Sequence, residues 1–176
     1  MSRILPFLFP LLLPALAFGG DNPSGYKIGA GDLLSITVFG EEDLSLRQVR
    51  VSSSGAISAP LLGEVRVEGM TSAQVESLLK KMLLDGYLRK PEVTVAILQY
   101  RMFYVNGEVK KPGGYPYVEG LTVEKAIALA GGLTYRASER KISLRKDKEE
   151  TVEAERVDMR SPVAPGDIIT VGESIF

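Results

Sequence analysis

Short apolar or alternating runs, separated by turn residues, occur along most of this chain. Alternation of apolar and polar side chains is typical of half-buried strands, and Gly, Pro, Asp and Ser clusters mark the turns between them. Strands are predicted at residues 33–39, 48–51, 56–62, 62–67, 93–97, 141–145 and 168–171. Apolar residues recur at helical spacing in two other places, so the chain predicts an α+β fold.

The first predicted helix begins after Thr71. Thr71 and Gln74 have the spacing of a capping box, in which each side chain bonds the other residue's backbone N–H. Asp85 and Gly86 are expected to end the helix. Its apolar face is predicted to comprise Val75, Leu78, Leu79 and Met82.

A second compact unit is predicted at residues 103–133. Asn106 and Gly107 suit the positive φ angles of a tight hairpin turn, and residues 111–114 suggest a second turn. Thr122 is the expected N-cap of a helix that Gly131 and Gly132 terminate. Nothing in this unit resembles reaction chemistry, so it points to binding or assembly.

Two segments of the chain resemble each other weakly. Residues 31–34, Gly-Asp-Leu-Leu, are similar to residues 166–169, Gly-Asp-Ile-Ile, and each half has one helix with a Thr cap. Shared turn chemistry and gene duplication both explain this similarity. The organisation predicts two small mixed-sheet modules, at residues 20–99 and 100–176.

The N-terminus is typical of a secretory signal peptide. Arg3 precedes an uncharged apolar run at residues 4–16, and residues 15–17 and 17–19 are small-x-small cleavage patterns. A retained membrane anchor is the alternative, although the run is short and contains three prolines. We therefore expect residues 1–19 to be cleaved and the mature protein to be periplasmic in a host with two membranes.

Composition narrows the possible functions. The 176 residues include no Cys, His or Trp, and 21 basic against 22 acidic residues give a net charge of −1. Without His or Cys the chain lacks the commonest general base, metal ligand and thiol nucleophile. Balanced charge offers little attraction for nucleic acid. We expect no enzyme activity, no cofactor, no metal and no nucleic-acid partner.

The carboxylates could form a metal site or a glycosidase site, but the sequence favours neither. Asp32 and Asp167 could hold a metal, but an Asp after Gly more often bonds its own turn. Glycosidase chemistry would need two carboxyl groups at a defined separation, one with a raised pKa. The available carboxylates lie in polar, loop-like stretches, namely Glu41, Glu42, Asp43 and Glu64.

Tyrosines and lysines of the second module are the candidate contact residues. Tyrosine rings, including that of Tyr100, can cover the apolar faces of sugars, and lysine ammonium groups can bind an acidic polymer. The alternatives are that the tyrosines pack across strands and that the lysines are solvated on a hairpin. Alternation would place Tyr115 and Tyr117 on one strand face. The predicted glycan or subunit contacts are Tyr104, Asn106, Glu108, Lys110, Lys111, Tyr115 and Tyr117.

Two segments together carry a family resemblance. The first is residues 26–38, YKIGAGDLLSITV, followed by residues 51–62 and the Thr71 helix. The second is residues 105–113, VNGEVKKPG, followed by residues 121–132 and the turn at 165–169. The chain resembles bacterial polysaccharide export proteins, in which a polysaccharide export domain precedes a soluble-ligand-binding β-grasp domain.

The resemblance implies a part in moving capsular polysaccharide or exopolysaccharide across the periplasm and outer membrane. Larger relatives form rings around a hydrated channel and work with an inner-membrane polysaccharide co-polymerase. Unlike them, this sequence has no lipidated Cys, one β-grasp domain and no C-terminal amphipathic helix. We therefore expect a homo-oligomer, periplasmic or associated with the outer membrane, that relies on a separate outer-membrane β-barrel. A glycan-binding or scaffolding module without a channel remains the alternative, and a polysaccharide-modifying enzyme is a more distant one.

Overall fold

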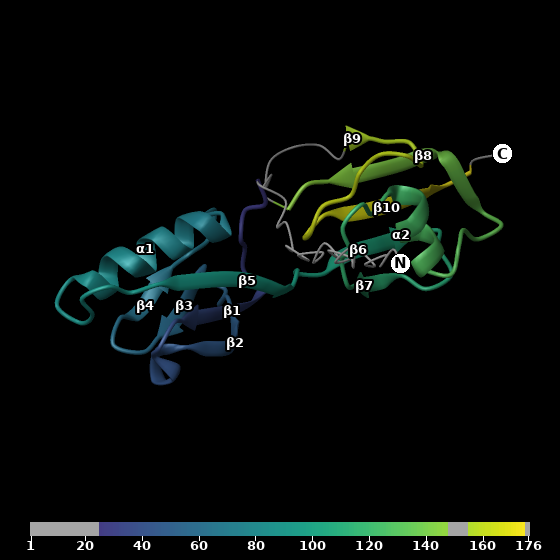
Figure 1. Ribbon diagram of the computed structural model, residues 1–176. Coiled ribbons are helices and arrows are strands. Elements are labelled where there is room, and N and C mark those ends of the chain that lie inside the picture. Colours follow the sequence, from purple (N-terminus) through teal and green to yellow (C-terminus); the bar gives the residue numbers. More distant parts are fainter. Residues whose placement is uncertain (1–24, 148–154, 175–176) are drawn as a thin grey trace, which may run out of the picture.

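The computed structural model describes residues 25–147 and 155–174. Two bodies of sheet and helix lie end to end, joined where strand β5 (Val93–Gln99) leads into strand β6 (Phe103–Gly107) (Figure 1). The predicted signal peptide at residues 1–19 lies outside the described residues, as does most of the charged segment between residues 146 and 156.

The first body contains two antiparallel sheets and one long helix. Strands β1 (Leu33–Val38) and β2 (Leu46–Arg50) form a sheet with β5 in the order β2-β1-β5, and the short helix η1 (Glu42–Leu44) connects β1 to β2. Strands β3 (Ala56–Ala59) and β4 (Gly63–Arg66) form a separate hairpin. Helix α1 (Ser72–Leu84) packs against β5 (Figure 1).

Helix α1 forms as the sequence predicts. The Thr71 hydroxyl accepts from the Gln74 N–H at 3.3 Å, and the Gln74 side chain accepts from the Thr71 N–H at 2.9 Å. Val75, Leu79 and Leu83 are buried, and the helix ends at Asp85. The Glu76 carboxylate also accepts from the Val95 N–H of edge strand β5 at 2.8 Å, which occupies a donor that the sheet leaves unpaired.

The second body is a mixed sheet covered by one helix. Strand β6 pairs in parallel with β10 (Ile168–Glu173), whereas β7 (Gly113–Tyr115), β8 (Ala137–Arg145) and β9 (Glu155–Arg156) join antiparallel in the order β7-β6-β10-β8-β9. Helix α2 (Val123–Leu129) lies over one face (Figure 1). This arrangement is β-grasp-like, and the predicted α+β class is confirmed.

Helix α2 has both of its predicted ends. The Thr122 hydroxyl accepts from the Lys125 N–H. At the other end the Gly131 N–H bonds the Ala128 carbonyl and the Gly132 N–H bonds the Ile127 carbonyl, a Schellman motif. Both glycines have positive φ angles, which that motif favours at the first of them.

Each body has its own apolar core. The first gathers Ile28, Leu34, Ile57, Val75 and Val95 among others, and the second gathers residues of β6, β8 and β10 around the inner face of α2. Phe103 is the largest fully buried side chain of the second core. Burial of this kind contributes about 1.5 to 3 kcal/mol per large apolar side chain.

The predicted tight turn at Asn106 and Gly107 is wrong. Gly107 ends β6 and lies beside Val171 of β10, and β7 starts only at Gly113, inside the predicted second turn. The connection therefore spans residues 108–112. Gly107 does have a positive φ of 82°, but its role is to let the backbones of β6 and β10 lie close together. A Cβ at this position would lie 2.1 Å from the Val171 carbonyl oxygen.

Within residues 25–147 and 155–174, no helix has the length and apolar character needed to cross a membrane.

Candidate functional site

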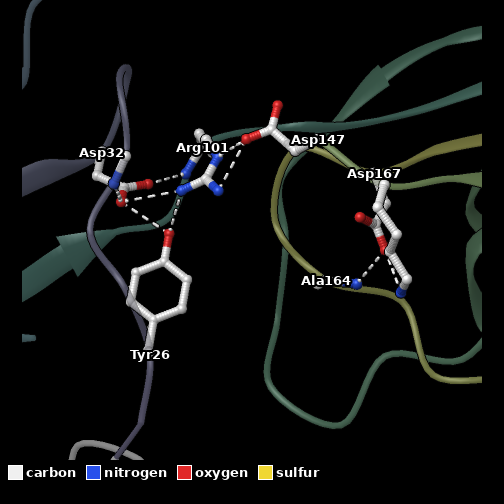
Figure 2. A network of polar contacts seen from close by, with 8 residues as sticks. Tyr26, Asp32, Arg101, Asp147, Ala164 and Asp167 are labelled. Carbon is white, nitrogen blue, oxygen red and sulfur yellow. Dashed lines mark hydrogen bonds and ion pairs between the residues drawn. The ribbon is translucent and has the colours of Figure 1, made fainter. Parts of the chain in front are cut away.

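The junction between the two bodies is organised around the carboxylate of Asp32. This side chain is fully buried at the start of β1. One oxygen accepts from the Tyr26 hydroxyl at 2.7 Å and the Gly29 N–H at 2.8 Å, and the other accepts from the Arg101 N–H at 2.7 Å (Figure 2). These donors supply hydrogen bonds to a carboxylate that water does not reach.

Arg101 joins the two bodies. Its guanidinium lies 3.3 Å from Asp32 of the first body and 2.9 Å from Asp147 of the second, and it donates to the Tyr26 hydroxyl at 2.6 Å (Figure 2). A Cβ on Gly29 would lie 2.4 Å from the guanidinium, so glycine leaves the space that Arg101 occupies. One side chain thus links the turn before β1 to the segment after β8.

Asp167 repeats the Asp32 turn in the second body. The Asp167 carboxylate accepts from the Ala164 N–H at 2.9 Å, three residues earlier, as Asp32 accepts from the Gly29 N–H, and Lys146 lies 3.0 Å away (Figure 2). Each aspartate bonds its own turn and one cation. The predicted turn role of both aspartates is confirmed, and the weak sequence similarity reflects a shared local structure.

Three tyrosines pack edge to face beside this network. The ring centroids of Tyr26 and Tyr100 are 4.8 Å apart, and those of Tyr100 and Tyr117 are 5.3 Å apart. Burial, followed by the bond to Asp32, raises the pKa of Tyr26 well above its usual range. Burial and the bond to Glu119 raise the pKa of Tyr100 similarly, and burial raises the pKa of Tyr117.

A polar pocket of about 440 Å³ opens beside the same junction. Residues of the Asp32 and Asp167 turns contribute to its wall. The other lining residues are Arg50, Gln99, Tyr100, Arg101, Met102, Tyr104 and Asp147. Tyrosine rings together with amide, guanidinium and carboxylate groups can bond hydroxyl groups of a ligand while covering its apolar faces. The pocket suits a hydroxyl-rich ligand.

The predicted contact residues do not gather in one place. Tyr104 lines the junction pocket and is 45% exposed. Asn106 is exposed on β6 itself, whereas Lys110 and Lys111 are exposed on the connection after β6, which docks on the end of α2. There the Lys110 N–H bonds the Gly132 carbonyl, and the Lys111 N–H bonds the Ala130 carbonyl.

The other three predicted contact residues make internal contacts. The Glu108 carboxylate accepts from the Thr134 hydroxyl at 2.6 Å. Tyr115 and Tyr117 are partly buried against the second core, and the Tyr115 ring packs against Phe103. Tyr117 lies beyond the end of β7, so the two tyrosines do not share one strand face as the alternation suggested.

Sequence reasoning missed Tyr26 and Arg101 as members of the junction. Arg101 is the second residue of the predicted second module, lies in no motif, and has partners that are distant in sequence. The one available signal was the isolated arginine at the predicted boundary. Among the described residues, no three His, Cys, Asp or Glu side chains come close enough together to hold a metal ion.

Comparison with known proteins assigns both halves of the chain. Residues 20–98 match the family described as polysaccharide biosynthesis/export protein, and residues 102–156 match the SLBB domain. The exopolysaccharide production protein ExoF of Rhizobium meliloti is 36% identical over 137 residues, which cover 69% of this chain and 32% of ExoF.

Two further relatives have export or transport in their names. The EPS I polysaccharide export outer membrane protein EpsA of Ralstonia nicotianae is 28% identical over 85% of this chain and 46% of EpsA. The polysialic acid transport protein KpsD of Escherichia coli is 28% identical over 65% of this chain and 20% of KpsD. The chain thus spans less than half the length of these relatives. With both domains matched in order and relatives of one kind, the chain belongs to the polysaccharide biosynthesis/export protein family.

Proposed function

We propose that this protein is a periplasmic component of a machine that exports capsular polysaccharide or exopolysaccharide. In this proposal residues 1–19 are a cleaved signal peptide, and modules at residues 20–99 and 100–176 oligomerise around the path of the polymer. The inner-membrane co-polymerase supplies the polymer, and a separate outer-membrane β-barrel receives it.

The observation that carries the proposal is the presence of both family domains, in order, in one chain. The names of ExoF, EpsA and KpsD refer to production, export or transport of polysaccharides. The Arg101 linkage supports a chain that acts as one rigid unit, since it ties the start of the first sheet to the second body through short polar contacts. Rigid building blocks favour defined oligomers, because fewer conformations are lost on assembly.

The junction pocket is the proposed contact with passing glycan. Its mixture of tyrosine rings and polar groups can form many weak hydrogen bonds with sugar hydroxyls. Weak, repeated contacts let a polymer move, whereas tight binding would stall it. The exposed Asn106, Lys110 and Lys111 offer a second contact surface, to glycan or to a neighbouring subunit.

We propose that the protein performs no catalysis. Glu41, Glu42 and Glu64 are exposed, whereas glycosidase chemistry needs two carboxyl groups held at a defined separation on either side of a bound sugar. The buried carboxylates Asp32 and Asp167 each bond a backbone donor of their own turn and a cation.

The test is to measure surface, periplasmic and cell-internal polysaccharide in a strain that lacks the protein. Loss of surface polymer, or polymer accumulating inside, supports export. Unchanged amount and length of surface polymer, in a strain without a paralogue, contradicts it. Sedimentation of the purified mature protein then separates the two binding roles, because a stable monomer favours a glycan-binding or scaffolding module without a channel.

A further inference from the structure

Basic side chains gather along a groove at the far edge of the second sheet. Two adjoining cavities of about 630 and 600 Å³ share Glu139, Arg140 and Arg156 as lining residues. Arg160 lines the first cavity and Lys141 the second. We call these cavities together the arginine groove, and their volumes fall within the range of about 300 to 1,000 Å³ found for small-ligand sites.

Three arginines of the groove are available for a ligand. Arg140, Arg156 and Arg160 are exposed, and none of them forms an ion pair within the part of the chain that the structure describes. By contrast, the exposed Arg136 nearby pairs with Glu173. A guanidinium presents a planar fork of donors that matches a carboxylate in two-point geometry.

The acidic residues of the groove do not cancel this charge. The lining includes the four cations Arg140, Lys141, Arg156 and Arg160 and the two carboxylates Glu139 and Asp158. The Asp158 carboxylate accepts from the Arg160 N–H at 2.7 Å and the Ser161 hydroxyl at 3.3 Å within its own turn. The groove therefore carries an excess of positive charge although the whole chain is nearly neutral.

Apolar side chains lie between the arginines. Val157 and Met159 line the first cavity and are partly buried against the second core. Such half-buried side chains can cover the apolar C–H face of a sugar ring while guanidinium groups bond substituents at its rim. The described lining contains no aromatic ring on which a nucleotide base could stack.

The short edge strand keeps the groove open. Strand β9 pairs with β8 only at Ser143 and Leu144, so residues 139–141 of β8 face the groove without a strand partner on that side among the described residues. Their backbone groups can bond a ligand that lies along the edge. This geometry favours an extended polymer over a compact ion.

We infer that the arginine groove binds an acidic polysaccharide whose sugars carry carboxylate groups. The inference rests on the proposed export function for the identity of the polymer, and it adds the charge class of the cargo and a site away from the junction pocket. Carboxylates at the rim bond Arg140, Arg156 and Arg160, and the sugar rings lie over Val157 and Met159.

The first experiment is a binding titration of the purified protein with a hyaluronan octasaccharide, in which every second sugar is a uronate. A neutral malto-octaose is the matched ligand. We expect binding of hyaluronan alone, weakening as sodium chloride is added, because salt screens exposed charges. Equal binding of both sugars, or of neither, overturns the inference.

Paired variants locate the site. Arg140→Gln with Arg156→Gln should weaken hyaluronan binding about tenfold, since each exposed ionic contact contributes up to about fivefold. Arg47→Gln with Arg89→Gln removes the same charge from exposed positions of the first body and should leave binding unchanged. Equal losses in the two variants, at unchanged melting temperature, overturn the inference.

Two other polyanions test whether the groove recognises acidic sugars or negative charge alone. Poly-glutamate has carboxylates without sugar rings, and phosphatidylglycerol vesicles offer phosphate at a lipid surface. Either one binding as tightly as hyaluronan overturns the proposed recognition of acidic sugars.

Binding and deletion results together distinguish acidic-polymer binding by the groove from a role in export. If deletion of the protein blocks export but the purified protein ignores hyaluronan, the groove inference is wrong and export stands. If hyaluronan binds through Arg140 and Arg156 but deletion leaves surface polymer unchanged, the groove stands and the export proposal is wrong.

Discussion

The Arg101 guanidinium lies 3.3 Å from the Asp32 carboxylate, although the two residues are 69 positions apart in the chain. Asp32 is fully buried and the Arg101 side chain is 12% exposed. Few water molecules can reach such a pair, so each charge depends on the other and on nearby donors. The segment that joins the two bodies is thus anchored to the first turn of the first body.

Removing the Asp32 carboxylate should destabilise the protein. Asp32→Ala leaves the Tyr26 hydroxyl and the backbone N–H groups of Gly29 and Arg101 without their acceptor, and loss of one partner of a buried pair costs about 3 to 5 kcal/mol. Urea unfolding measures this change in the free energy of unfolding. Asp43→Ala, at an exposed position of η1, is the control and should change it by less than about 0.5 kcal/mol. Equal effects of the two variants would contradict the importance of the junction.

Alkaline pH should weaken the folded state through the buried tyrosines. Burial raises the pKa of Tyr26, Tyr100 and Tyr117 in the folded protein, whereas in the unfolded chain each tyrosine has a pKa of about 10. Above that pH the unfolded state loses protons that the folded state keeps, so the free energy of unfolding falls as pH rises. It is unaffected by these groups well below pH about 10.

The ultraviolet absorbance of tyrosinate tests this prediction. The chain has seven tyrosines, and part of the absorbance change should appear only as the protein unfolds. Tyr26→Phe should reduce that late fraction. A single titration step for all tyrosines, with folding intact, would show that these rings are accessible to water.

Gly107 and Gly63 allow a matched test of close backbone approach. Both have positive φ angles, 82° and 70°, but a Cβ on Gly107 would lie 2.1 Å from the Val171 carbonyl oxygen, whereas a Cβ on Gly63 meets nothing within 4 Å. Gly63→Ala should therefore cost only the backbone strain, about 1 to 2 kcal/mol. Gly107→Ala adds a clash between β6 and β10 and should cost at least about 3 kcal/mol. Thermal unfolding compares them, and equal losses would contradict the close packing of β6 on β10.

Local signals in the sequence predicted the helices well. The capping box at Thr71 and Gln74 and the paired glycines after α2 act over a few neighbouring residues, so their chemistry can be recognised without the tertiary structure. Alternation likewise located most strands. These local features are sufficient to predict the α+β class.

Long-range contacts explain what the sequence did not predict. Asn106 and Gly107 have the composition of a hairpin turn, but parallel pairing of β6 with β10 keeps Gly107 in the sheet. Arg101 belongs to no motif and Tyr26 only begins one, and the approach of the two bodies brings both of them together with Asp147. Glu108 looked available, but the loop after α2 supplies Thr134 as its partner.

The contrast between Tyr104 and Tyr115 offers a direct test of the proposed glycan contact. Tyr104 is 45% exposed at the junction pocket, while the Tyr115 ring packs against Phe103 of the second core. Tyr104→Ala should leave the melting temperature nearly unchanged and reduce surface polysaccharide in the complemented deletion strain several-fold, since one stacking contact contributes about 0.5 to 1.5 kcal/mol. Tyr115→Ala should instead lower the melting temperature by several degrees, because truncating a packed aromatic ring costs about 3 kcal/mol. If Tyr104→Ala supports export as well as the unchanged protein does, the junction pocket does not contact the passing polymer, and the glycan path must be sought at the exposed lysines after β6 or along the arginine groove.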